Sequence, residues 1–143
     1  MQFQKMDEGW AVRLDKGEKL LATLHEFLKA QDIQGGYLWG IGSVTAADLG
    51  YYDVHTKEYL HKQFSDVYEL LSLQGNITMV EGKPFVHAHV LLSGRDYQVF
   101  GGHLFEAEVR ATVETFISPW STVIGRQLNE QIGLKLWHFH SKM

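Results

Sequence analysis

The sequence has 143 residues, 45% of them hydrophobic and 21% charged, which is ordinary for a soluble globular protein and predicts a single domain over residues 1–143. The formal net charge is −4, and the lysines and arginines are scattered, without the local cationic cluster that nucleic-acid binders use. The sequence has no cysteine, which excludes disulfides and thiolate chemistry. No segment resembles a signal peptide or approaches the roughly 20 apolar residues of a membrane span, so we expect a cytoplasmic protein without membrane contact.

The first segments of the chain predict a strand followed by a helix. Between residues 10 and 15 apolar and polar side chains alternate, which is typical of a half-buried strand. A helix is then expected from a cap at Asp15 or Gly17 to about Gln31. Its apolar stripe consists of Leu20, Leu21, Leu24, Phe27 and Leu28. His25 lies beside this stripe, and we expect it on the helix surface.

The middle of the chain predicts a series of strands joined by turns. The expected strands are residues 37–44, 49–54, 59–64 and, as one bent strand, 67–80. The sequence Gly40-Ile-Gly42 lacks the third glycine and the following helix of a dinucleotide-binding motif, so these glycines are better explained by a bulge or a close strand crossing.

Two histidines lie on the next predicted strand, which ends with Leu92. Side chains alternate there, so His87 and His89 share one face while the other face is uniformly apolar. A turn follows at residues 93–96, and the next strand is expected to begin near Tyr97.

If Ser93 pairs with Tyr97, His103 lies directly opposite His87, and Gly101 leaves open space beside His89. Three neutral imidazoles next to a vacant position are typical of a zinc site with three histidine ligands. A His-x-His pair alone is more often an ordinary strand feature. The third histidine favours a divalent-metal site, with zinc as the expected ion.

The remaining segments complete the predicted sheet. A short loop after His103 is expected to lead to a strand over residues 109–117, on which Glu114 lies opposite the apolar face. Residues 123–129 are expected to form a loop or a helical turn, and residues 134–139 a last strand. One main helix against seven or eight strands indicates an α+β fold with a curled, mostly antiparallel sheet.

Three segments together resemble the PPC domain, the plant and prokaryote conserved domain also known as DUF296, in its prokaryotic stand-alone form. They are Arg13-Leu-Asp-Lys-Gly-Glu18; Gly40-Ile-Gly-Ser-Val44 with Leu49-Gly-Tyr-Tyr-Asp53; and His87-Ala-His-Val90 through Gly101-Gly-His-Leu104 to Thr112-Val-Glu114. The resemblance implies a homotrimer and a role in DNA binding or regulation, with DNA or a protein as partner. Plant members carry an AT-hook with an Arg-Gly-Arg-Pro core, which is absent here because the only prolines are Pro84 and Pro119.

The same fold is shared, by similarity, with acetolactate decarboxylase, whose zinc is held by a His-x-His pair and a later histidine. This likeness implies an alternative function, a zinc-dependent enzyme acting on a small carboxylate-bearing substrate. Glu114 is then the candidate general acid or base, and Arg126 the candidate carboxylate clamp. Structural roles, Glu114 as a partner of Arg110 and Arg126 as an interface residue, are the more common explanation for such residues. Whether the protein is an enzyme stays open on the sequence.

Overall fold

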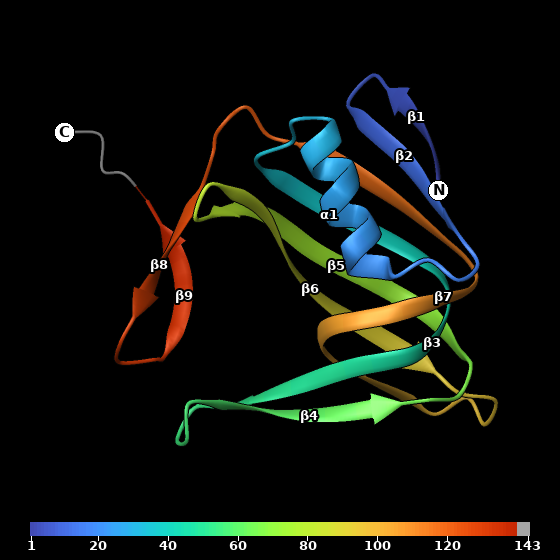
Figure 1. Cartoon of the computed structure of the whole chain (residues 1–143). Helices are drawn as coiled ribbons and strands as arrows, with labels where there is room; N and C mark the ends of the chain where they lie inside the picture. The colour runs from blue at the N-terminus through green and yellow to red at the C-terminus, as the bar shows by residue number, and fades with distance from the viewer. Residues whose placement is uncertain (140–143) are drawn as a thin grey trace.

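The structure is a computed structural model that describes residues 1–139 (Figure 1). Over these residues it contains one helix and a nine-stranded sheet, which confirms the predicted α+β class. The elements are β1 (Gln2–Met6), β2 (Gly9–Asp15), α1 (Leu20–Ala30), β3 (Gly36–Asp53), β4 (Glu58–Phe64), β5 (Tyr68–Val80), β6 (Lys83–Ser93), β7 (Val99–Pro119), β8 (Gly125–Asn129) and β9 (Leu134–His138). The expectation of a single domain includes residues 140–143, which lie outside the described range, and it stays a prediction.

The sheet curls because its two longest strands pair with different neighbours along their length. β3 and β7 pair with each other in antiparallel fashion from Gly36 opposite Pro119 to Gly50 opposite His103. β5 pairs with the first part of β3, β6 pairs with β5, and β6 also pairs with the start of β7. These four strands therefore close a ring (Figure 1). The buried apolar side chains of the ring and of α1 form the core.

Helix α1 covers the part of the ring where β6 no longer pairs with β7. The predicted apolar stripe of α1 is buried, as expected. The helix has no side-chain cap of its own at Lys19. Instead, the carboxylate of Glu106 on β7 accepts hydrogen bonds from the backbone N–H groups of Leu21 at 2.8 Å and Ala22 at 3.1 Å. A residue distant in sequence thus satisfies the unpaired N–H groups of the first helical turn.

His25 is not on the free helix surface as expected, but half-buried against β6. Its Nε2 accepts a hydrogen bond at 3.2 Å from the backbone N–H of Val86. Val86 lies beyond the part of β6 that pairs with β7, so the imidazole occupies a position where a neighbouring strand would otherwise be. Because an unpaired buried N–H is costly, this contact stabilises the open edge of β6.

The strand boundaries differ from the expected ones where the chain bulges. Two predicted strands join into β3, in which Ala46 adopts a φ of +46° at a register shift. The loop expected after His103 is absent, and β7 is continuous from Val99 to Pro119. Residues 125–129 form β8 rather than a loop or helical turn, and β1 was not predicted. Bulges interrupt the alternation of apolar residues, so one long strand has the sequence pattern of two short ones.

Helix α1, the one helix within residues 1–139, is too short to cross a membrane.

Candidate metal centre

The two histidines of β6 lie on the outer face of the ring, as their alternation with apolar residues predicts. Val86, Ala88 and Val90 point into the core and are at most 3% exposed. His87 is half-buried and His89 is exposed on the opposite face. The buried row fixes the orientation of the strand, so both imidazoles are held on one side.

His103 lies beside them on β7, but the prediction that it pairs with His87 across the hairpin was wrong. Ser93 pairs with Val99, so His103 lies opposite His89 and Gly101 lies opposite Leu91. The turn is longer than expected because the Tyr97 N–H donates to the Gly94 carbonyl at 3.0 Å, with Tyr97 at a φ of +60°. The shift in register is even, and His103 therefore stays on the same face as His87 and His89.

The three imidazoles converge closely enough to share one ion. Their ring centroids are separated by 5.2 Å for His87 and His89, 5.1 Å for His87 and His103, and 5.4 Å for His89 and His103. One nitrogen of each ring lies within 4.8 Å of the others. Tetrahedral zinc with Zn–N bonds of about 2.0–2.1 Å places its ligand atoms about 3.3 Å apart, so small ring rotations would complete the site. The Nδ1 of His103 is buried and has no hydrogen-bond partner, which fits a metal ligand.

Two of the three candidate ligands, His87 and His103, are held neutral by their surroundings. Burial, followed by the charges of Arg126 and His89, lowers the pKa of His87 to about 4. Burial, followed by the other two histidines of the cluster, lowers the pKa of His103 to about 4. A metal-binding imidazole must be neutral, so at pH 7 protons compete only weakly with a metal for these two rings.

Arg126, predicted as a candidate site residue, contacts the cluster directly. From β8, its Nη2 lies 3.3 Å from Nδ1 of His87 and donates to Oδ1 of Asn76 at 2.9 Å. Its Nε donates to the buried hydroxyl of Thr78 at 2.8 Å, and its guanidinium lies over the ring of Phe85. The sequence analysis missed Asn76 and Thr78 as site residues. The polar Gly75-Asn76 interruption in the apolar pattern of β5 is the signal that could have found Asn76.

An aromatic wall formed by Tyr59, His61 and Phe105 flanks His103 on its other side. The ring of Tyr59 is 5.0 Å and that of Phe105 is 4.8 Å from the His103 ring. His61 stacks on Phe105 at 4.1 Å. Gly50 makes this packing possible, because a Cβ at that position would lie 2.4 Å from Phe105.

Glu114, the other candidate catalytic residue, is not part of this cluster. It is exposed on β7 between Arg13 of β2 and Ile41 of β3. Within residues 1–139 no hydrogen bond or ion pair joins it to His87, His89 or His103, or to Arg110.

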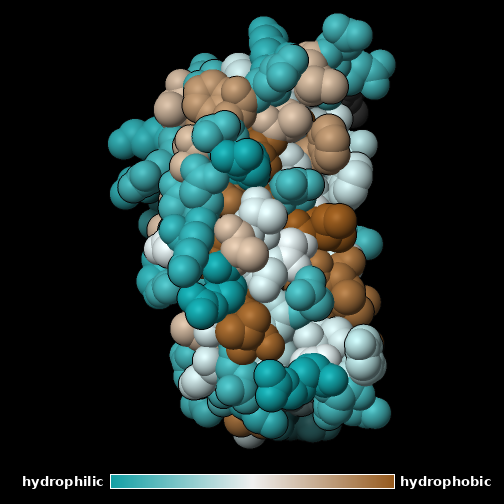
Figure 2. Space-filling model, turned by 90° about the vertical axis from the view of Figure 1, so that its right-hand side faces the viewer, coloured by the Kyte–Doolittle hydropathy of each residue, from teal (hydrophilic) through white to brown (hydrophobic). Residues whose placement is uncertain are grey.

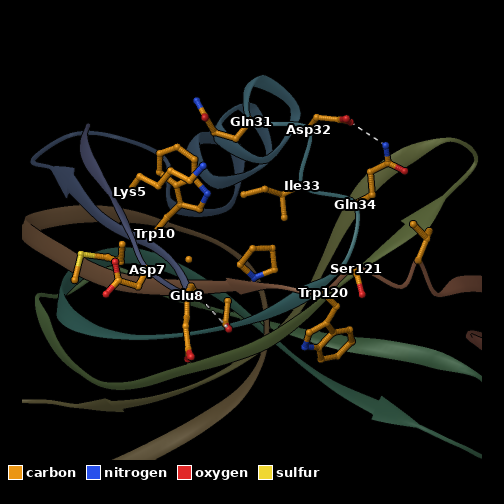
Figure 3. Close-up of a pocket in the computed structure, with 15 residues that line it drawn as sticks. Lys5, Asp7, Glu8, Trp10, Gln31, Asp32, Ile33, Gln34, Trp120 and Ser121 are labelled. Atoms are coloured by element: carbon orange, nitrogen blue, oxygen red, sulfur yellow. Dashed lines mark hydrogen bonds between the residues drawn. The ribbon is translucent and has the colours of Figure 1, made fainter.

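A separate cavity of about 810 Å³ lies between the β1–β2 turn, the α1–β3 connection and the end of β7, with Trp10, Ile33 and Trp120 on its walls (Figure 3). The histidines are not among its lining residues.

Comparison with known families identifies the architecture. The model of the Plants and Prokaryotes Conserved (PCC) domain, the family abbreviated above as PPC, matches residues 1–121. The chain belongs to this family. The match includes every residue of the histidine cluster and ends before β8, so Arg126 lies outside the matched region.

Solved structures of PPC proteins share the fold over nearly the whole chain. A metal-containing protein from Archaeoglobus fulgidus is 41% identical, with 97% of this chain and 99% of that chain covered and a TM-score of 0.86. A PPC protein from Pyrococcus horikoshii is 35% identical, with 98% and 96% covered and a TM-score of 0.87. A candidate DNA-binding protein from Bacteroides thetaiotaomicron is 27% identical, with 96% of each chain covered and a TM-score of 0.93. A comparison with curated proteins finds no match.

Proposed function

We propose that this PPC-domain protein binds one divalent metal ion, zinc in the first place, between His87, His89 and His103. The convergence of one nitrogen from each ring to within 4.8 Å of the others carries the proposal. The unpartnered, buried Nδ1 of His103 and the relative described as metal-containing support it. A bound zinc would supply a Lewis acid with an open position, and these three rings would hold it. The apolar core behind them lets the sheet fold without metal.

The test is metal content and thermal unfolding with and without zinc, for the wild type, His103→Ala and His55→Ala. His55 is exposed in the β3–β4 turn and serves as the matched control. Zinc at a thousand times its dissociation constant adds at most about 4 kcal/mol to the free energy of unfolding, so the wild type and the control should gain in melting temperature. His103→Ala should lose both the metal and this gain. Equal responses of all three proteins would contradict the proposal.

We further propose that the protein acts as a homotrimer with a DNA-binding or regulatory role, as the family implies. Trp39 of β3 and Phe116 of β7 stack at 4.9 Å on the outer face and are 47% and 41% exposed, beside Ile41 at 53%. Apolar residues also reach the surface in several places on the side shown in Figure 2. Contiguous exposed apolar residues favour a protein partner, here other copies of the chain. Sedimentation should give a species of three chain masses that Trp39→Ser converts to monomers, and a monomeric wild type at micromolar concentration would contradict it.

The alternative function is a zinc-dependent enzyme that acts on a small carboxylate-bearing substrate. The guanidinium of Arg126 beside His87 favours it, because arginine binds carboxylates through paired hydrogen bonds. Glu114 stays the candidate acid or base of this proposal. Titration of the zinc-loaded protein with lactate tests it: binding should be measurable for the wild type and lost in Arg126→Gln, and equal heats for both would contradict it.

A further inference from the structure

The imidazole of His87 would have to accept a hydrogen bond from Arg126 and also bind the metal. An arginine has only hydrogen-bond donors, so in the 3.3 Å contact with Nη2 the Nδ1 of His87 must be the acceptor. A neutral imidazole has one such acceptor nitrogen, and its other nitrogen carries the proton. His87 in this contact therefore presents Nε2–H, which cannot bind a metal.

Neither nitrogen of His87 can bind a metal while the hydrogen bond with Arg126 is present. If the metal binds Nδ1, it takes the lone pair that accepts from Arg126. If the metal binds Nε2, the proton must move to Nδ1, where it faces an N–H of the guanidinium. In both cases a divalent cation also repels the adjacent charged guanidinium. Metal ligation by His87 and the Arg126–His87 hydrogen bond therefore exclude each other.

Arg126 belongs to the β8–β9 hairpin, which is attached to the rest of the fold by polar contacts. No residue from Gly125 to His138 is buried, so the hairpin adds nothing to the core. Besides those of Arg126, the bonds that attach it to the rest of the fold include bonds from its side chains and bonds to backbone carbonyls of the hairpin or its flank. They are Trp137 Nε1–H to Asn76, Lys135 to Glu81, Met79 N–H to the Ile124 carbonyl, Tyr52 hydroxyl to the Ile132 carbonyl, and Lys57 to the Glu130 carbonyl. Removal of one charge-assisted bond is thus a large change for this element.

We infer that metal binding expels Arg126 from His87 and loosens the β8–β9 hairpin, so that the hairpin reports the occupancy of the site. The inference rests on the proposed metal site. By linkage the coupling is reciprocal, and the docked hairpin must lower the metal affinity by the same factor by which the metal weakens docking.

Two measurements test the coupling with Zn²⁺ as the probe. Hydrogen exchange of the wild type follows the amides of residues 125–138, which should exchange about tenfold faster with saturating zinc. Zinc titrations compare the wild type with Arg126→Gln and with Arg13→Gln, which removes the same charge from the exposed surface of β2. Arg126→Gln should bind zinc about tenfold more tightly than the wild type, and Arg13→Gln should not differ. In Arg126→Gln zinc should no longer change the exchange of the hairpin.

The outcomes separate the coupling from the metal site itself. Zinc binding with equal affinity in the wild type and Arg126→Gln, or with unchanged or slower hairpin exchange, would overturn the coupling and leave the metal site standing. No zinc binding by any of the three proteins would overturn both. The exchange experiment needs no substitution, so its result does not depend on how well the variants fold.

Discussion

At the scale of single residues, the candidate site depends on residues that have no metal-binding side chain themselves. Gly50 is one such residue: it lies opposite His103 on β3, and its missing side chain makes room for the rings of Phe105 and Tyr59. Those rings in turn pack against the imidazole of His103. The orientation of a candidate metal ligand is therefore set in part by a residue that cannot bind metal.

Gly50→Ala should lower both stability and metal affinity. The added Cβ would lie 2.4 Å from Phe105 and must displace its ring, at a cost of about 1–3 kcal/mol in the free energy of unfolding. Denaturant unfolding and a zinc titration measure the two effects. Gly125→Ala is the control, since nothing lies within 4 Å of a Cβ there, and an equal loss in both variants would contradict the explanation.

His25 should make stability depend on pH. Burial lowers its pKa below the ordinary value of 6.5, against an opposing effect of Glu106. The folded-state pKa is the lower one, so the stability that neutral His25 supports is present above pH 6.5 and is lost as the pH falls through the folded-state pKa. Protonation also removes the lone pair that accepts from Val86.

The measurement is unfolding of the metal-free wild type and His25→Gln between pH 8 and pH 5. The glutamine carbonyl can accept from Val86 without titrating, so the difference between the proteins should shift in favour of His25→Gln as the pH falls. A difference that stays constant over this range would show that His25 does not contribute.

At the scale of elements, α1 depends on β7 for its first turn. Glu106 accepts from two backbone N–H groups of the helix, although the sequence placed the helix start at Asp15 or Gly17. Asp15 and Glu18 instead pair with the N-terminal amine, and this pairing raises the pKa of that amine. The helix boundary is thus a property of the tertiary fold.

Glu106→Ala should destabilise the protein by about 1–2 kcal/mol, the upper part of the range found when a helix cap is removed, because Glu106 accepts from two N–H groups. Glu108→Ala is the matched control, because its partly exposed ion pair with Lys19 is worth at most about 1 kcal/mol. Chemical denaturation of both variants tests the difference. If Glu108→Ala is destabilised as much as Glu106→Ala, the capping role is wrong.

The sequence predicted which face of β6 carries the histidines, but not which residues pair with or contact them. Alternation along residues 85–92 correctly separated the histidine face from the core, because the pleat of a strand imposes it. The partner of His103 could not be obtained, since it depends on the length of a turn in which Tyr97 adopts a left-handed conformation. The contact of Arg126 with His87 was equally hidden, because it joins β8 to β6, two strands that do not pair with each other. β8 is attached to β5 instead, through the only parallel pairing in the described part of the sheet.

At the scale of the whole molecule, the net charge of the protein bears on whether it binds DNA. The net charge is −4, and the lysines and arginines form no local cluster in the sequence of the kind that releases many phosphate counterions. We therefore expect weak binding to duplex DNA by this protein alone, whatever its relatives bind. A titration at about 150 mM salt tests this, and sub-micromolar affinity with a steep dependence on salt would contradict it.

The three histidines of the proposed metal site all lie in the β6–β7 hairpin, between His87 and His103. Contacts this close in sequence cost little chain entropy to form, whereas the pairing of β3 with β7 must close a long loop. A chain that folds in the presence of zinc should therefore gather its ligands before the ring closes, and refolding should be faster with zinc than without. The unfolded chain should also retain some affinity for the ion, so the rise in melting temperature will be smaller than the affinity of the native protein alone implies.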